Sequence, residues 1–250
     1  MSTKHRTLPA LEEDYQVLSD TVREFADEVV APVSAELDAK HEFPYEIVAQ
    51  MGEMGLFGLP FPEEYGGMGG DYFALALALE QLGRVNQSVA ITLEAGVSLG
   101  AMPLLKFGTQ EQKRLFLQPM IDGRFFGTMC LTEPHAGSSL SDIRTKAEPH
   151  ADGSYRIKGN KIFISGGDHP LSENIVHMVL AKLPDAPDSV KGISLFLVPK
   201  FLDDGSRNPA FCGGLEHKMG IKGSATCVMN FEGARGWLIG EPNKIGRAHV

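Results

Sequence analysis

The chain has few of the residues that mark disulfide-stabilised or metal-binding proteins. Only three of its 250 residues are cysteines, Cys130, Cys212 and Cys227. Their number is odd and they lack close spacing, so the sequence indicates neither a disulfide framework nor a zinc site. The eight histidines are scattered. His169 and His177 are too far apart to share a helical face, and we therefore expect no metal site.

Positive charge and long apolar runs are also scarce. The 23 Lys and Arg residues are outnumbered by 32 Asp and Glu, which gives a formal net charge of -9. Nucleic acids and anionic membranes require clustered positive charge, so we expect neither as a partner. The longest apolar stretch, Tyr72–Leu79, is too short to cross a bilayer, and the charged N-terminus resembles no signal or transit peptide. We therefore expect a cytoplasmic protein without a membrane span.

What the chain does have is a hydrophobic content of 43%, enough for a sizeable core. In the first half, apolar residues recur at helical spacing, as in the series Leu18, Val22, Phe25 and Val29. This helix should end or kink near Pro32. Residues 88–105 are rich in Ala, Gly, Leu and Val, which predicts a helix that is packed on several sides.

After Gly123 the pattern changes to strands and turns. The segments 155–158 and 161–165 flank Gly159-Asn160, and Asp152-Gly153 marks an earlier turn, so we predict a hairpin or meander there. Further apolar strands are expected at 174–183, 192–199 and 227–231. The sequence thus predicts an all-α half, residues 1–123, joined to an all-β half, residues 124–244.

The most informative segment for chemistry is Thr128–Ser139. An apolar, β-prone run, 125–131, leads into hydroxyl side chains, a proline and a glycine. This layout can deliver backbone donors to the edge of a ligand. A strand that ends in a polar turn is more often only a turn, so the segment alone leaves both interpretations open.

The order of several motifs is more specific. Residues 131–138, 159–165 and 192–199 together resemble the acyl-CoA dehydrogenase family. Residues 62–67 and 107–113 resemble the helical part of the same family. The resemblance covers roughly Asp14 to Lys244. Residues 128–227 look most like the branch that contains 3-methylmercaptopropionyl-CoA and broad-chain dehydrogenases, whereas the helical half looks more like short- and branched-chain members, so the resemblance leaves the acyl substrate open.

The resemblance implies an N-terminal helical domain, a middle β-barrel domain and a C-terminal four-helix domain that together hold FAD. It also implies FAD-dependent α,β-dehydrogenation of an acyl-CoA thioester to its trans-2-enoyl form, with electrons passed to an electron-transfer flavoprotein. The full-length protein is expected to be a homo-oligomer.

The family's cofactor contacts, carried over by residue, fall on Met129, Cys130, Leu131, Thr132, Gly137, Ser138, Phe163, Ile164 and Ser165. Thr132 would donate to the polar edge of the flavin, and Ser138 would also lie near the acyl-CoA. Phe163 and Ser165 match the pair that covers and hydrogen-bonds the flavin, although Phe163 replaces the usual Trp and lacks its indole N–H. We interpret Glu133 as a structural carboxylate bonded to local N–H groups.

The end of the chain carries a further expectation. Residues 240–244 look like the family's approach to its C-terminal domain, but residues 245–250 do not continue that pattern. They match the translation of a common sequencing adapter, so we expect a non-native tail on a chain truncated before the C-terminal domain. The family's catalytic Glu lies in that domain, and no residue here is assigned as catalytic. We expect residues 1–250 alone to bind FAD weakly or not at all and not to turn over acyl-CoA.

Two alternative functions use the same scaffold. An acyl-CoA oxidase would share these motifs and differ in the access of oxygen to the flavin. A non-catalytic binding module would retain the helical domain and the barrel, but it would leave the hydroxyls of Thr132 and Ser165 without an evident purpose.

Overall fold

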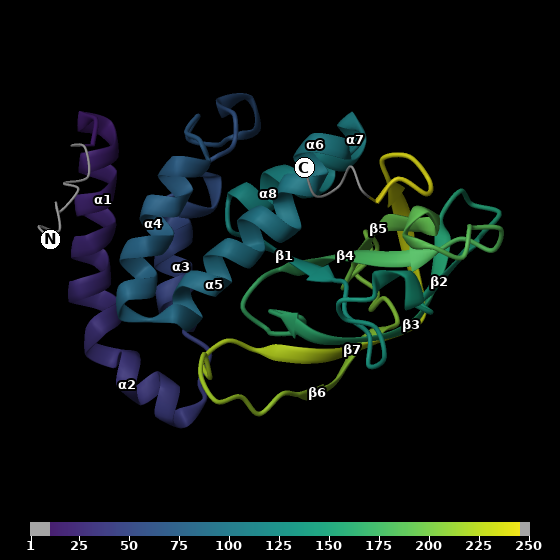
Figure 1. Ribbon diagram of the computed structural model, residues 1–250. Helices are drawn as coiled ribbons and strands as arrows, with labels where there is room; N and C mark the ends of the chain where they lie inside the picture. Colours follow the sequence, from purple (N-terminus) through teal and green to yellow (C-terminus); the bar gives the residue numbers. More distant parts are fainter. Residues whose placement is uncertain (1–10, 246–250) are drawn as a thin grey trace, which may run out of the picture.

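The computed structural model describes residues 11–245 and consists of a helical half and a half built of strands (Figure 1). The helices are α1 (Glu13–Phe25), α2 (Ala31–Lys40), α3 (Tyr45–Glu53), α4 (Tyr72–Val85), α5 (Gln87–Glu94), α6 (Met102–Phe107), α7 (Gln110–Gln112) and α8 (Gln118–Ile121). The strands are β1 (Phe125–Cys130), β2 (Lys146–Pro149), β3 (Tyr155–Ser165), β4 (Asn174–Lys182), β5 (Ile193–Pro199), β6 (Ala210–Leu215) and β7 (Thr226–Ile239). The predicted order of a helical half followed by a β half is confirmed. Residues 246–250 of the expected tail lie outside the described residues.

Three prolines lie inside helices, in α2, α6 and α8, and a wider turn of helix precedes each of them. The π-helical turns Ala26–Val30, Ala95–Ala101 and Lys113–Leu117 end two residues before Pro32, Pro103 and Pro119. Proline has no N–H to donate, and its ring clashes with the carbonyl of the preceding turn; a π turn relieves both problems. The chain therefore kinks between α1 and α2 rather than ending its helix at Pro32 (Figure 1).

One apolar helical stretch, 87–107, runs through the centre of the helical half. Asn86 begins it by accepting hydrogen bonds from the N–H groups of Ser88 (2.9 Å) and Val89 (3.2 Å). By length and composition this stretch could cross a membrane, with a mean hydropathy of 1.5, but 72% of its most apolar window is buried inside the protein. The predicted burial of residues 88–105 is confirmed.

All seven strands belong to one curled sheet. The strand order is β1-β4-β2-β3-β7-β5, β6 pairs with β7, and β4 also pairs with β5. β2 meets β4 at a single residue pair, Lys146 with Lys182. β4 ends at Lys182, the partner of Lys146, so the ladder between β2 and β4 does not continue. The predicted barrel is thus corrected to a curled sheet that is not closed.

The predicted hairpin at Gly159-Asn160 is wrong, because β3 is one strand of 11 residues. A Cβ at Gly159 would lie 2.3 Å from Oγ1 of Thr145. Glycine is therefore required here for the close approach of another segment and not for a turn. The predicted turn at Asp152-Gly153 is confirmed: it joins β2 to β3, and Gly153 has a φ of 79°.

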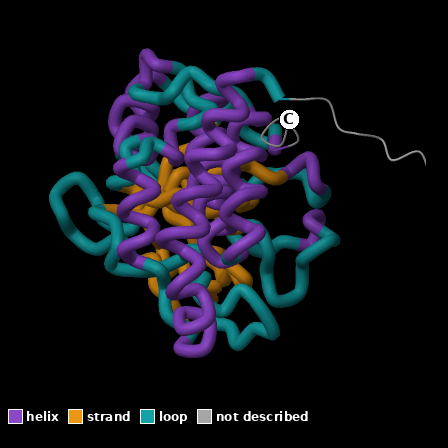
Figure 2. The backbone as a smooth tube through the Cα atoms, turned by 90° about the vertical axis from the view of Figure 1, so that its left-hand side faces the viewer, coloured by secondary structure: helices purple, strands orange, loops and turns teal. Residues whose placement is uncertain are grey.

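A direct backbone contact joins the two halves. A Cβ on Gly100, in the π-helical turn Ala95–Ala101, would lie 2.4 Å from the Cα of Gly127 in β1. Beside this contact, the rings of Phe57 and Phe126 pack edge to face at 5.5 Å. Figure 2 shows the helices as a layer in front of the strands. The position of β1, and of the turn that follows it, is therefore set by the helical layer.

Candidate functional site

The segment Thr128–Ser139 leaves β1 at Cys130 and enters a tight turn. Glu133 and Ala136 exchange two backbone hydrogen bonds, each of 3.0 Å. The N–H of Ile162 in β3 donates to the carbonyl oxygen of Thr132 at 2.9 Å. This bond fixes the turn to β3 directly beside Phe163.

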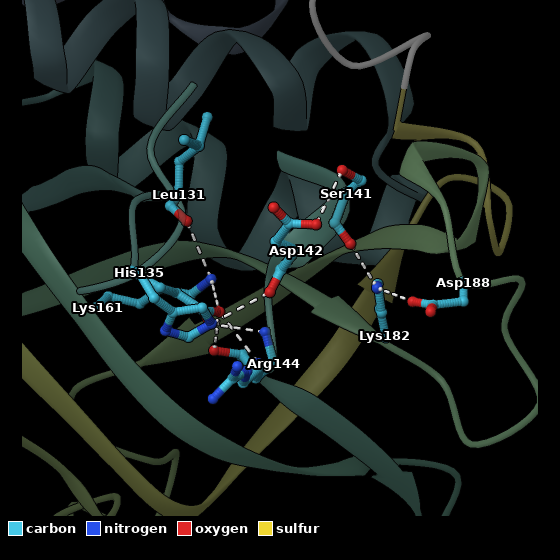
Figure 3. A network of polar contacts seen from close by, with 10 residues as sticks. Leu131, His135, Ser141, Asp142, Arg144, Lys161, Lys182 and Asp188 are labelled. Atoms are coloured by element: carbon cyan, nitrogen blue, oxygen red, sulfur yellow. Dashed lines mark hydrogen bonds and ion pairs between the residues drawn. The ribbon is translucent and has the colours of Figure 1, made fainter. Parts of the chain in front are cut away.

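A buried ion pair lies beneath the turn (Figure 3). Glu133 is 3% exposed and Lys161 is fully buried, and their Oε1 and Nζ atoms are 2.8 Å apart. The carboxylate of Glu133 also accepts hydrogen bonds from the N–H groups of Arg144 (2.7 Å) and Thr145 (3.0 Å) and from the Thr145 hydroxyl (2.6 Å). Lys161 donates a further bond to the carbonyl of Leu131 at 3.1 Å. The prediction that Glu133 is a structural carboxylate held by local N–H groups is confirmed.

The two charges of this pair depend on each other. Burial by itself would raise the pKa of Glu133, but the charge of Lys161 and the hydrogen bonds from Lys161, Thr145 and Arg144 hold that pKa below its ordinary value. Burial lowers the pKa of Lys161, and the carboxylate of Glu133 opposes this effect. Removing either partner would leave an uncompensated buried charge.

Three predicted contact residues face outward from the turn. Thr132 is half-buried, and Gly137 and Ser138 are exposed. A Cβ at Gly137 would lie 3.9 Å from the Cγ2 atom of Thr132, so these two residues are adjacent. The turn thus presents hydroxyls and backbone groups on one exposed edge.

Four other predicted contact residues, in and after β1 and in β3, point into the protein. Met129 and Leu131 are half-buried and pack against the core that the helices and the sheet share. Cys130 and Ile164 are 0% and 2% exposed, and both belong to the core inside the sheet. Only the backbone of Cys130 and Ile164 is therefore left for contact with a ligand.

Phe163 occupies a bulge in β3. Lys161 pairs with Met229 and Ile164 pairs with Cys227, so β3 has one extra residue between these two pairs. Phe163 adopts a left-handed backbone with a φ of 60°, and 59% of its surface is exposed. An aromatic side chain rarely adopts this conformation or this exposure, so the surrounding ladder must impose both.

Side chains of His135 and Lys182 hold the backbone that follows the turn, at Ser141 and Asp142 (Figure 3). Nε2 of His135 lies 3.1 Å from the carbonyl oxygen of Asp142. Nζ of Lys182 donates to the carbonyl of Ser141 at 2.7 Å and to Asp188 at 3.0 Å. The chain on both sides of Ser138 is thus anchored.

Sequence reasoning missed the part played by Lys161 and Thr145. The available signal was a lysine at the start of an otherwise apolar run, Lys161–Ile164, which indicates a charge that needs a buried partner. Within residues 11–245 no group of three or more His, Cys, Asp or Glu side chains is placed to hold a metal ion.

Comparison with known families identifies the fold. The N-terminal domain of acyl-CoA dehydrogenases matches residues 12–124, and the middle domain matches residues 128–234. The chain belongs to the acyl-CoA dehydrogenase family. The family predicted from the motifs is confirmed.

Among individual proteins, 3-methylmercaptopropionyl-CoA dehydrogenase of Ruegeria pomeroyi is 45% identical over 78% of this chain and 34% of its own length. A solved structure described as the electron transferring flavoprotein of Acidaminococcus fermentans contains a similar chain, with a TM-score of 0.87 and 36% identity over 97% of this chain and 63% of that one. An acyl-CoA dehydrogenase of Bacillus anthracis complexed with FAD gives a TM-score of 0.82 and 31% identity over 95% of this chain and 40% of that one. The chain thus spans a third to three fifths of the length of similar proteins.

Proposed function

We propose that this chain forms one wall of the FAD site of an acyl-CoA dehydrogenase that oxidises an acyl-CoA thioester to its trans-2-enoyl form. The observation that carries the proposal is the placement of the turn 131–139 beside the bulge at Phe163. The hydrogen bond from the N–H of Ile162 to Thr132 joins them. One element supplies polar groups and the other an exposed aromatic ring.

The residues fit a flavin. A flavin ring has flat apolar faces and a polar edge, so its site requires an apolar cover and hydrogen-bond donors. Phe163 presents a ring that is not used in the protein core. Within the part of the chain that the structure describes, the hydroxyls of Thr132, Ser138 and Ser165 have no hydrogen-bond partner. These groups are therefore available to a ligand, together with the backbone of Met129–Leu131, Gly137 and Ile164.

FAD, when bound, supplies the acceptor for the hydride that leaves the β carbon of the substrate. In this proposal Thr132 and Ser165 orient the cofactor, Phe163 shields it from water, and Ser138 contacts both cofactor and acyl-CoA. Removal of the weakly acidic α proton requires a carboxylate base. Glu133 is not that base, because its carboxylate is buried and already accepts four hydrogen bonds. One of these comes from Lys161, with which Glu133 forms the ion pair.

The similar proteins support the details of the proposal. The Ruegeria pomeroyi relative is named for an acyl-CoA substrate, and the Bacillus anthracis structure is described as complexed with FAD. The Acidaminococcus fermentans structure is described as an electron transferring flavoprotein, which supports a partner of that class. The cytoplasmic location and the homo-oligomeric state expected from the sequence belong to the same proposal.

The test uses the complete gene product that carries this chain, purified and measured for bound FAD and for FAD affinity. The double variant Thr132→Val with Ser165→Ala should bind FAD about 30-fold more weakly, since each lost hydrogen bond is worth about 1 kcal/mol. Thr21→Val is the matched control, because the Thr21 hydroxyl bonds only within α1, to the carbonyl of Val17. Anaerobic addition of acyl-CoA esters should bleach the flavin of the wild-type protein.

Two outcomes would overturn the proposal. The first is a complete gene product that neither carries nor binds FAD. The second is a double variant whose FAD affinity equals that of Thr21→Val.

A further inference from the structure

A cavity of about 310 Å³ opens at the surface where the helical half meets the β half. The connection between α2 and α3 forms one side of it. The loop between β3 and β4 and the loop between β6 and β7 form the rest. None of the predicted flavin contacts lines this cavity, so the function proposed above does not account for it.

Two half-buried lysines line the cavity without a carboxylate partner in the part of the chain that the structure describes. Nζ of Lys218 donates to the carbonyl oxygen of Ser224 and to the hydroxyl of Thr226, each at 2.6 Å. An ammonium has three protons, so one is left without an acceptor. Burial lowers the pKa of Lys218, as expected for an ammonium with no carboxylate beside it. Lys222 donates only its backbone N–H, to Asp38 at 3.3 Å. Partly buried cations of this kind favour a bound anion.

The acids in the lining do not cancel both lysine charges. Asp168 is already paired with Lys200 at 2.6 Å and with Arg207 at 3.1 Å. Glu216 is the other acid of the lining. Burial, followed by the charge of Lys200, lowers the pKa of His169 to about 4, so this ring adds no charge near neutral pH. Two lysines against one glutamate leave one net positive charge, which a monoanion balances.

Much of the remaining lining is apolar and aromatic. The rings of Phe43 and Tyr45 lie 5.2 Å apart, and Phe43 stacks on the ring of His169 at 5.3 Å with an interplanar angle of 15°. Leu215 adds an apolar side chain that is 63% exposed. Rings and apolar side chains around a few polar groups are typical of sites for small organic molecules, and the rings favour a flat one.

Two loops that line the cavity are strained. His41 and Ile221 adopt a left-handed backbone, with φ values of 55° and 46°. A β-branched residue such as Ile221 rarely adopts this conformation, so its surroundings must impose it. The two loops also touch, since a Cβ at Gly223 would lie 3.1 Å from the carbonyl oxygen of Glu42. Backbone strain of this kind is concentrated at ligand sites.

We propose that this cavity binds a small aromatic monocarboxylate. Its carboxylate accepts a hydrogen bond from the ammonium of Lys218, and its ring packs against Phe43 and Tyr45. The N–H of Gly166 donates to the carbonyl of Ala225, a lining residue, at 2.7 Å. A ligand in the cavity should therefore restrain both loops of the β half that line it.

The experiment titrates the 250-residue chain with benzoate in a calorimeter and repeats the titration with benzamide and with inorganic phosphate. Benzamide has the ring without the charge, and phosphate has the charge without the ring. Both should bind at least about 10-fold more weakly than benzoate. Lys218→Met should weaken benzoate binding by a similar factor, because it removes a charged hydrogen bond. Lys191→Met is the matched control, since it removes the same charge from an exposed position outside the cavity, and it should bind benzoate as the wild-type chain does.

Hydrogen exchange locates the bound benzoate: exchange should slow at residues 166–170 and 222–226. Slowed exchange confined to the turn 131–139 would place benzoate elsewhere and overturn the proposal. A wild-type chain that does not bind millimolar benzoate would do the same, as would equal binding of benzamide or phosphate, or equal affinities of Lys218→Met and Lys191→Met. If Lys218→Met does not fold, Lys218→Gln removes the charge and keeps a donor for Ser224. None of these measurements involves a flavin, so they do not depend on the proposed function.

Discussion

The two segments that meet at the candidate site are held in opposite ways. The turn 131–139 lies on a buried ion pair, and the carboxylate of Glu133 has partners from three other residues. Phe163 has a strained backbone, with a φ of 60°, and a ring that is 59% exposed. One segment is stabilised by its own contacts, whereas the other is held in an unfavourable conformation by the register of β3 against β7. This strain and the exposure of the ring are the reasons for our proposal that the bulge serves a ligand.

The largest expected effect comes from removing the anchor of the turn, which is the ion pair between Glu133 and Lys161. Lys161→Met leaves the carboxylate of Glu133 buried without a counter-charge and should lower the free energy of unfolding by about 3–5 kcal/mol. Urea denaturation measures this loss. The double variant Lys161→Met with Glu133→Gln removes both charges and should recover part of it. A single variant within about 1 kcal/mol of the wild-type chain would show that the pair is not an anchor.

Acid should weaken the same anchor by protonating Glu133. The pKa of Glu133 is below its ordinary value in the folded chain, so its contribution to stability is fully present above about pH 4.3 and is lost as the pH falls through the folded pKa. The effect should be smaller than that of Lys161→Met, because the neutral acid can keep some of its hydrogen bonds. The measurement is the difference in unfolding free energy between wild type and Glu133→Gln from pH 7 to pH 3. A difference that does not shrink in acid contradicts the assignment.

The position of the turn also depends on the contact between Gly100 and Gly127. Gly100→Ala would place a Cβ 2.4 Å from the Cα of Gly127, and we expect it to cost about 1–3 kcal/mol in unfolding free energy. Gly220→Ala is the matched control, because no atom lies within 4 Å of the added Cβ, and it should change stability by less than about 0.5 kcal/mol. Equal effects of the two variants would show that the halves can separate slightly at no cost.

The contrast between the two segments also shows what the sequence could predict. Helical periodicity and family motifs identified the two halves, the turn and the structural role of Glu133. The uninterrupted course of β3 through Gly159 was not predictable, because Gly-Asn is a strong turn signal and the reason for the glycine is Thr145, which is distant in sequence. The burial of Lys161 depends on the same long-range packing. The left-handed backbone of Phe163 has no local signal, since it follows from the register of β3 against β7.

The smallest predicted effect isolates the strain at Phe163. Glycine adopts a left-handed backbone without the clash of a Cβ, so Phe163→Gly should be about 1 kcal/mol more stable than Phe163→Ala, which loses the same ring but keeps the strain. Thermal and urea unfolding of the two variants measure the difference. In the complete gene product both variants should bind FAD more weakly, and to the same extent, because both lack the ring. A glycine variant more stable than the alanine variant would show that the bulge stores strain, whereas equal stability of the two variants would show that it stores none.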